Sequence, residues 1–474
     1  MPAAIRFLFL LWEVCRMSEK KNTFTSGKIL GPLMAFSIPV ILALVLQSLY
    51  GAVDLLVVGQ FASSSDVSAV ATGSQIMQTI TNVVAGLSMG TTILIGQLIG
   101  EGNHKQAGKA MGASVVFFAI VAVVLSAVML LNIQRIAVIM QAPAEAFDAT
   151  CDYIRICSWG LVFITAYNVL GSLFRGLGNS TLPLVSVAIA AVINIFGDLL
   201  FVAVFHMGAA GAAIATVLSQ AISVVISYII IRHIKLPFEM GKKDIRFDGA
   251  ITKKVFNFGF PLALGDFLVG LSFLIIASIV NSLGVISSAG VGVAEKVCAF
   301  IMLVPSAFSQ SIAAFVAQNY GADKMDRAHK GLRYAITVSF AIGAFMAWLS
   351  FFHGDFLCGI FSKDPEVTAA GWEYLKAYAI DCFLTSIFFN FNGYFNGIGK
   401  TKFVMIQSLI GAFGARVPIS FLMSKVQPVS LFRIGLATPS SSALQVILCL
   451  IYMYKVAIPQ ERRKAQIDQK TLNQ

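Results

Sequence analysis

Long apolar stretches alternate with short polar segments from residue 29 to residue 456 of this chain. Each stretch holds roughly 20 or more residues, enough for a helix to cross about 30 Å of hydrocarbon. The pattern predicts twelve membrane-spanning helices, near residues 29–60, 67–99, 108–132, 151–174, 182–205, 209–232, 252–283, 287–320, 331–353, 367–396, 401–425 and 430–456. We therefore expect an all-α polytopic membrane protein.

The chain contains an internal repeat, with an offset of about 221 residues. The segment 96–107 (GQLIGEGNHKQA) returns as 317–328 (AQNYGADKMDRA). Tyr153 returns as Tyr374 at the same offset. Six spans per half give both halves the same orientation, which is typical of a parallel repeat in transporters. We expect two six-helix bundles related by this repeat.

Pro39 of the first span returns, one residue out of step, as Pro261 of the seventh. A proline inside a helix removes one backbone hydrogen bond and gives the helix a place to bend. Pro39 is therefore a candidate hinge in the inner half of span 1.

A charged connector with Pro237 and Gly241 divides the two halves. The domain organisation that we predict has five parts. These are a cytoplasmic N-terminal segment (1–28), an N-lobe of spans 1–6 (29–235), a cytoplasmic connector (236–251), a C-lobe of spans 7–12 (252–456) and a cytoplasmic tail (457–474).

The net charge is +11, in a chain of which 57% of the residues are hydrophobic and only 12% are charged. This composition is that of a membrane protein, so the positive charge indicates how the protein is oriented in the membrane. Most Lys and Arg residues lie in the N-terminal segment, the connector, the tail and every second loop. The alternate loops hold only Arg135, Lys363, Lys425 and Arg433. Positive charge stays on the cytoplasmic side, so we expect a plasma-membrane protein with both termini in the cytoplasm. The basic residues then contact membrane lipid rather than nucleic acid.

Neither the N-terminus nor the cysteines point to further chemistry. Residues 1–16 match neither a span nor a signal peptide, and a second Met at position 17 suggests an overextended start. The seven cysteines lack paired spacing, so we expect no disulfide framework and no cysteine metal site.

Two acids lie inside the spans of the first half, Asp54 in span 1 and Asp198 in span 5. A charge at the centre of a membrane helix costs on the order of 2.5 to 3.5 kcal/mol, so such residues call for a reason. Asn194 precedes Asp198 by one helical turn and shares its face, and Thr216 of span 6 reaches a similar depth. These oxygen ligands suit Na+ or a proton, and two adjacent carboxylates cannot both stay ionised cheaply unless a cation neutralises them. The alternative is that both acids only stabilise helix packing through hydrogen bonds.

At these residues the chain resembles the multidrug and toxic compound extrusion (MATE) transporters, from about residue 27 to residue 455, and in motif it is closest to their DinF-like branch. The resemblance rests on Pro39 with VDLLVVGQ (53–60), GQLIGEG (96–102), LFRGLGNSTLP (173–183), NIFGDLLF (194–201) and AQNYGA (317–322). It implies a cation site in the N-lobe at Asp54, Asn194, Asp198 and Thr216, with Tyr153 and Asn168 lining the same lobe.

The resemblance also implies secondary active multidrug efflux. An inward Na+ or H+ gradient would drive amphipathic, mainly cationic organic compounds out of the cell by alternating access, with span 1 bending at Pro39. No cofactor beyond the coupling ion is implied, and we expect a monomer.

The second half departs from the first at the candidate site, because the repeat partners of Asn194 and Asp198 are Ala415 and Ile419. Its spans instead contain Asp266, Glu295, Lys296, Asp381 and Arg416. Either a second coupling or substrate site at Asp266, Glu295 and Asp381, or a set of structural ion pairs, fits this composition.

Two other functions remain open from the sequence. A flippase for lipid-linked or polysaccharide precursors, from the same superfamily, would favour cationic grooves over buried acids. A membrane enzyme could use Ser88 in the G-x-S-x-G segment 86–90, but the five histidines all lie in loops or near span ends. Close helix packing explains these glycines better, and the GKT segment at 399–401 lacks the earlier glycine of a phosphate-binding loop. We therefore expect a transporter, not an enzyme.

Overall fold

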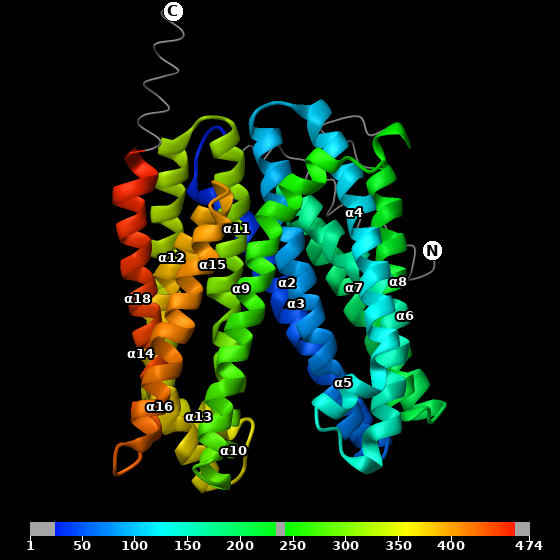
Figure 1. The fold of residues 1–474 in the computed structure, drawn as a ribbon, viewed down its shortest axis with the longest axis vertical. Helices are drawn as coiled ribbons and strands as arrows, with labels where there is room; N and C mark the ends of the chain where they lie inside the picture. The colour runs from blue at the N-terminus through cyan, green and yellow to red at the C-terminus, as the bar shows by residue number, and fades with distance from the viewer. Residues whose placement is uncertain (1–23, 234–241, 460–474) are drawn as a thin grey trace, which may run out of the picture. The chain divides into compact units, whose positions relative to one another are not determined.

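A computed structural model describes residues 24–233 and 242–459, and all regular structure in these residues is helical (Figure 1). The chain divides into two compact units, and the division falls between Ala263 and Leu264. Most of the predicted N-terminal segment, connector and tail lies outside the described residues.

The first unit contains the helices of the first half and the start of α9. Its elements are α2 (Leu30–Phe61), α3 (Ser64–Gly100), α4 (His104–Leu131), α5 (Ile133–Ile139), η1 (Ala144–Ala146), α6 (Phe147–Gly176), α7 (Thr181–Asp198), η2 (Leu199–Val204), α8 (Gly208–His233), η3 (Lys242–Asp244) and α9 (Gly249–Asn281).

The second unit contains the rest of α9 and the helices of the second half. Its further elements are α10 (Val285–Ile301), α11 (Leu303–Gly321), α12 (Met325–Phe352), α13 (Gly354–Gly359), α14 (Pro365–Gly397), α15 (Thr401–Leu409), η4 (Ile410–Arg416), α16 (Val417–Lys425), α17 (Leu431–Gly435), α18 (Ala437–Tyr452) and η5 (Met453–Ala457).

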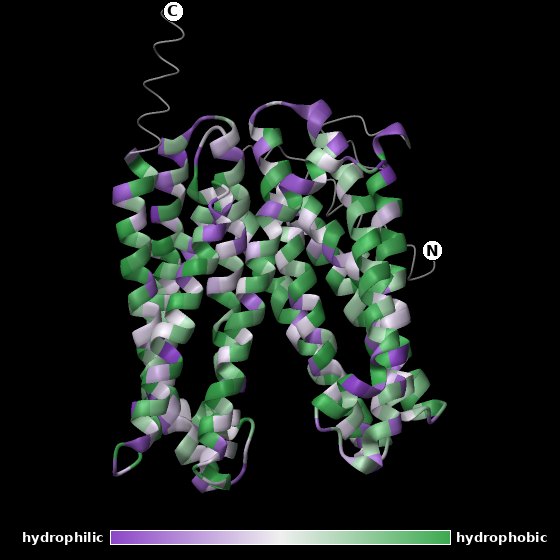
Figure 2. Cartoon of the chain, viewed as in Figure 1, coloured by the Kyte–Doolittle hydropathy of each residue, from purple (hydrophilic) through white to green (hydrophobic). Residues whose placement is uncertain are grey.

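The helices confirm the predicted fold class. Eleven helical segments of the described residues are long and apolar enough to cross a membrane. The remaining predicted span is α14, which is 33 residues long and has its charges at Glu366, Glu373, Lys376 and Asp381. In Figure 2 apolar residues cover the lengths of the helices, and polar residues gather at their ends.

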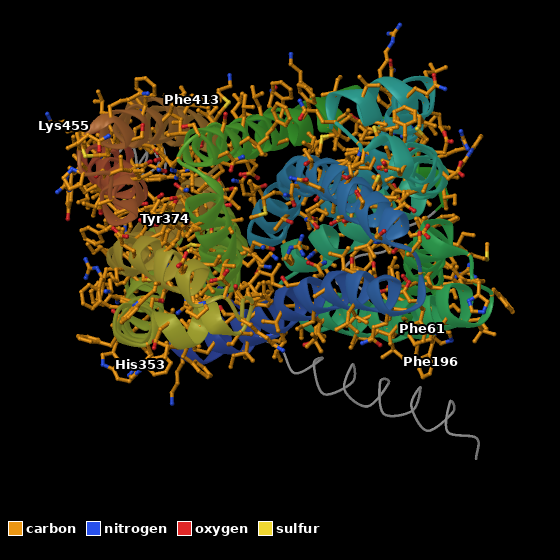
Figure 3. The ribbon with its side chains drawn as sticks, turned by 90° about the horizontal axis from the view of Figure 1, so that it is seen from below. Phe61, Phe196, His353, Tyr374, Phe413 and Lys455 are labelled. Carbon is orange, nitrogen blue, oxygen red and sulfur yellow. The ribbon has the colours of Figure 1, made fainter. Side chains whose placement is uncertain are left out.

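Large apolar side chains face outward, as expected for helices surrounded by lipid. Phe196 of α7 is 69% exposed, whereas Tyr374 of α14 is 1% exposed. Figure 3 shows Phe61 and Phe196 at the edge of the first unit and Tyr374 within the second. In water such apolar exposure would be costly, so it indicates a hydrocarbon environment.

Helix caps satisfy the backbone where the chain turns back at one end of the first unit. Ser63 and Asp66 form a capping box at the start of α3. The Asp66 carboxylate also accepts a hydrogen bond from the backbone N–H of Ala209 at 2.9 Å. Gly208 has φ of +54° and lies against Asp66, so a side chain at this position would clash. These contacts tie the start of α3 to the start of α8.

The boundary between the two units falls inside α9, because the first part of this helix packs on α3. A Cβ at Gly90 of α3 would overlap the carbonyl of Val255, and a Cβ at Gly259 of α9 would overlap the backbone of Leu87. Small residues allow this close approach of two helix backbones.

The packing of the first unit brings four helices around one interior. Helix α2 packs on α7, and α8 packs on both α6 and α7. In the second unit α14 packs on α10, α11, α12 and α18, while η4 packs on α18. In each half the fourth helix is therefore central.

Candidate functional site

The structure brings together the four polar residues predicted to form a site in the first half. Asp54 of α2 is 6% exposed, and Asn194 and Asp198 of α7 are 0% exposed. The Asp54 carboxyl group faces Asp198 and Asn194, and it accepts a hydrogen bond from the Thr216 hydroxyl of α8 at 3.3 Å. Three helices thus supply two carboxylates, an amide and a hydroxyl to one buried point.

Most oxygens of this cluster have no hydrogen-bond donor in the part of the chain that the structure describes. The atoms without a partner are Oδ1 of Asp54, both carboxylate oxygens of Asp198, and Oδ1 and Nδ2 of Asn194. An unsatisfied buried polar group costs about 1–3 kcal/mol, and more when it is charged. A cation or a proton at this point would remove that cost, so the donor set fits a monovalent ion.

The aromatic ring of Tyr153 closes one side of the cluster. Tyr153 of α6 is 3% exposed and lies close enough to Asp54 and Asp198 to interact with both electrostatically. Its ring packs directly on Gly73 of α3, where a Cβ would overlap it. The absence of a side chain at position 73 therefore sets the position of this ring.

Two further polar residues lie beside the predicted ones. Tyr50 of α2 lies one turn before Asp54 and interacts with it, and Gln220 of α8 lies one turn after Thr216 and against Tyr50. Neither was predicted from the sequence, although each lies four residues from a predicted site residue, a spacing that places it on the same helix face.

Asn168 of α6 is not part of this cluster. Its side-chain amide donates to the carbonyl of Ile164 at 2.9 Å, one turn earlier in the same helix, and none of its hydrogen bonds reaches the two carboxylates. Pro39 lies inside α2, fifteen residues before Asp54, and the helix runs unbroken through it.

The fifth helix of each half changes from α-helical to π-helical geometry beside its charged residue. In the first half η2 starts directly after Asp198, and in the second half η4 ends at Arg416. Such π segments add one residue to a turn and are frequent at functional sites.

In the second unit the three predicted second-site residues differ in their exposure. Asp266 of α9 is exposed. Glu295 of α10 is half-buried, and Asp381 of α14 is 1% exposed. Glu295 lies near Tyr374 and Asp381 lies near Tyr378, and Arg416 lies near both tyrosines of α14. The ion pair found among the described residues joins Arg155 to Asp152, so none of these acids forms a direct ion pair there.

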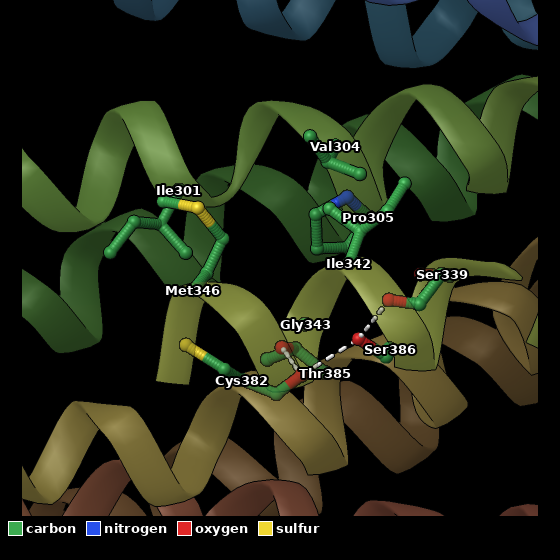
Figure 4. A pocket seen from close by; sticks show the side chains of 10 residues that line it. All are labelled: Ile301, Val304, Pro305, Ser339, Ile342, Gly343, Met346, Cys382, Thr385 and Ser386. Carbon is green, nitrogen blue, oxygen red and sulfur yellow. Dashed lines mark hydrogen bonds between the residues drawn. The ribbon is translucent and has the colours of Figure 1, made fainter. Parts of the chain in front are cut away.

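A small cavity lies beside this second group, between α10, α11, α12 and α14 (Figure 4). Its volume is about 10 Å³, which is room for a single water at most. Ser386 lines it and donates to the carbonyl of Cys382 at 2.7 Å. The cavity is too small for an organic substrate.

Other candidate chemistries find structural explanations. Within residues 24–233 and 242–459, no three His, Cys, Asp or Glu side chains cluster as a metal site, and the six cysteines there are free and buried. Ser88 of the G-x-S-x-G segment exchanges a hydrogen bond with Ser172 at 2.7 Å. Gly90 of the same segment packs on α9. This segment serves helix packing.

A family model described as MatE matches the chain twice, over residues 39–200 and 261–422. The two matches begin at the repeated prolines, Pro39 and Pro261. They confirm the internal repeat independently of the motifs quoted above.

Similar curated proteins span nearly the whole chain. It is 27% identical over 406 residues to the probable multidrug resistance protein YpnP of Bacillus subtilis, covering 85% of this chain and 91% of that protein. It is 25% identical over 412 residues to the probable multidrug resistance protein NorM of Thermotoga maritima, covering 85% and 86%.

Solved structures share the fold. One is described as the outward-facing conformation of a multidrug resistance MATE family transporter of the MOP superfamily. It has a TM-score of 0.87 at 19% identity and covers 94% of this chain and 99% of that one. A MATE described as in the straight conformation has a TM-score of 0.86 at 18% identity, with coverage of 94% and 99%. With two six-helix bundles and a family match over both halves, this integral membrane protein belongs to the MatE family of transporters.

Proposed function

We propose that this chain is a multidrug efflux transporter that exchanges Na+ or H+ for amphipathic, mainly cationic organic compounds by alternating access. The observation that carries this proposal is the buried cluster of Asp54 and Asp198 with Asn194 and Thr216, most of whose oxygens lack a hydrogen-bond donor among the described residues. The relatives described as multidrug resistance proteins support the substrate class.

The cluster has the chemistry that ion coupling requires. When no cation is bound, two adjacent carboxylates repel each other in a medium of low dielectric constant. A Na+ ion between them, or a proton on one of them, removes this repulsion. Ion binding therefore changes the charge and the preferred packing of α2, α7 and α8, which supply the ligands.

Helix α2 connects the ion site to a hinge at Pro39. It carries both Asp54 and Pro39, so a change of charge at one position acts on a helix already weakened at the other. Related proteins are described in a straight and in a bent conformation, which supports bending as part of the cycle.

The cell context follows from the charge distribution. We place the protein in the plasma membrane as a monomer, with both termini in the cytoplasm and membrane lipid around it. Na+ or H+ serves as the coupling ion, and no other cofactor is needed.

A flippase for lipid-linked precursors is less well supported. An anionic substrate would call for several cations on one face, whereas the first unit buries two acids and the buried Arg416 of the second unit has acids near it. The buried negative charge favours cationic substrates.

Uptake of a fluorescent cationic dye into inside-out vesicles tests the proposal. Na+ and H+ gradients are imposed separately on the parent chain, on Asp198→Asn and on Asp152→Asn, a matched control at an exposed carboxylate. We expect gradient-driven uptake that Asp198→Asn abolishes and Asp152→Asn retains. No dye movement with either gradient, in folded protein, would favour the flippase.

A further inference from the structure

The second unit buries a charged cluster that the proposed cycle does not use. Arg416 is 5% exposed and lies near Asp381 and Tyr378. Glu295 lies near Tyr374, which also lies near Arg416. Burying a guanidinium in a membrane protein is costly, so its presence calls for a specific reason.

This cluster occupies the place in the second half that the ion cluster occupies in the first. The first cluster draws on the first, fourth, fifth and sixth helices of its half. The second draws on the same four, α9, α14, η4 and α18, and also on α10, which holds Glu295. Tyr374 is the repeat partner of Tyr153. Arg416 adjoins Ala415, the repeat partner of Asn194.

The contacts of Arg416 hold its charge in place without a direct ion pair. Its Nη1 donates to the Ser272 hydroxyl at 3.3 Å, and its Cζ lies 4.4 Å from the ring centroid of Phe273, both on α9. Its Nε has no partner. The guanidinium of Arg416 directly contacts only neutral groups among these. Its stacking on Phe273 and the nearby carboxylate of Asp381 stabilise its charge.

The two clusters therefore differ in one respect that bears on ion binding. The first has two carboxylates and no basic side chain among its described contacts. The second places the guanidinium of Arg416 near the carboxylate of Asp381. A fixed positive charge lowers the affinity of the surrounding acids for a further cation.

We propose that Arg416 is a tethered cation. Its guanidinium replaces, in the second unit, the exchangeable Na+ or H+ that binds at Asp54 and Asp198 in the first unit. The inference rests on the proposed function and adds a stoichiometry to it: each transport cycle moves a single coupling ion. The carboxylate of Asp381 belongs to a latent cation site that Arg416 keeps closed.

Equilibrium binding of radioactive Na+ to the purified full-length chain, at a mildly alkaline pH, tests this inference. Alkaline pH keeps the carboxylates free to bind a metal ion. We expect one Na+ per parent chain and none for Asp198→Asn. In the Asp198→Asn background, Arg416→Gln should restore one bound Na+. Arg416→Lys, the matched control that keeps a tethered cation, should not restore it. Adding Asp381→Asn to the Arg416→Gln variant should remove the restored ion.

If the parent chain binds no Na+, the same variants are compared by proton uptake on acidification. Uptake should fall by one proton in Asp198→Asn and rise again when Arg416→Gln is added. Thermal unfolding of each variant shows whether it is folded. If Arg416→Gln does not fold, the single variant Asp198→Asn is compared directly with the double variant that carries both Asp198→Asn and Asp381→Asn.

The inference is overturned if Asp198→Asn retains an ion that is lost on adding Asp381→Asn. It is also overturned if folded Arg416→Gln and Arg416→Lys variants bind ions equally. The proposed function fails separately, if the parent chain and Asp198→Asn bind the same ions and neither gradient moves dye.

Discussion

At the scale of residues, Thr216 gives the cluster its one hydrogen bond to a carboxylate. Its hydroxyl donates to Asp54 at 3.3 Å, while the other oxygens of Asp54 and Asp198 have no donor. A bound cation would use the oxygen of Thr216 as a ligand and would hold the hydroxyl in this orientation. In the proposed site, we therefore expect Thr216 to tune ion affinity and the carboxylates to provide the charge.

Removing this hydroxyl should weaken ion binding without abolishing transport. We expect Thr216→Val to raise the ion concentration that half-saturates dye uptake by about tenfold, since each tenfold change in affinity corresponds to 1.4 kcal/mol and a hydrogen bond to a charged group contributes about that much. Thr216→Ser keeps the oxygen and serves as the control. Equal impairment of both variants would contradict a ligand role for the hydroxyl.

The sequence was enough to predict Asp54, Asn194, Asp198 and Thr216 as one site, because acids in apolar spans are rare and helical spacing aligns their neighbours. It did not reveal Tyr50 or Gln220, which are polar residues of types that occur throughout membrane helices. Asn168 is the converse case, since a polar side chain in a span can bond to its own helix backbone.

At the scale of elements, α2 combines a proline inside the helix with a carboxylate of the buried cluster. Pro39 and Asp54 share this helix, whereas Pro261 shares α9 with Ile276 at the position equivalent to Asp54. The two helices begin each half and offer a natural comparison.

Replacing the proline of α2 should slow transport more than it alters ion binding. We expect Pro39→Ala to lower the rate of dye uptake by at least about fivefold and to change ion affinity little, because it stiffens a hinge remote from the ligands. Dye uptake and Na+ binding are measured on the same preparations. A larger loss of rate in the control, Pro261→Ala, would argue against a special hinge in α2.

Helix packing in the first unit depends on glycines at close backbone contacts. Gly90→Ala should destabilise the chain by about 1–3 kcal/mol, because its Cβ would meet the Val255 carbonyl. Thermal unfolding in detergent checks this. Gly59→Ala on α2, where nothing lies within 4 Å of the added Cβ, is the control and should unfold like the parent chain. Unchanged unfolding of Gly90→Ala would contradict the close contact.

The apolar pattern predicted the helices well, including α14, in which four charged residues interrupt the apolar sequence. It could not predict η2 and η4, because a single extra residue in one turn hardly changes an apolar periodicity. The unit boundary within α9 also escaped it, since glycines that permit a close crossing look like any other small residues.

At the scale of the whole molecule, the charge distribution predicts which loops face the cytoplasm. Lys324 lies between α11 and α12, and Lys363 lies between α13 and α14; both are exposed. A membrane-impermeant maleimide should label Lys363→Cys in intact cells, and Lys324→Cys only after permeabilisation. The parent chain measures background, since its described cysteines are buried. The reverse labelling pattern would overturn the proposed orientation.

Ion–substrate exchange is the central claim, and thermodynamic coupling makes it testable in the reverse direction. In proteoliposomes without an imposed ion gradient, an outward gradient of cationic dye should drive Na+ or H+ inward, read by an ion-sensitive fluorophore in the lumen. We predict ion movement in the parent chain that disappears in Asp198→Asn. Dye movement without any ion movement in the parent chain, for both ions, would contradict coupled exchange at this site.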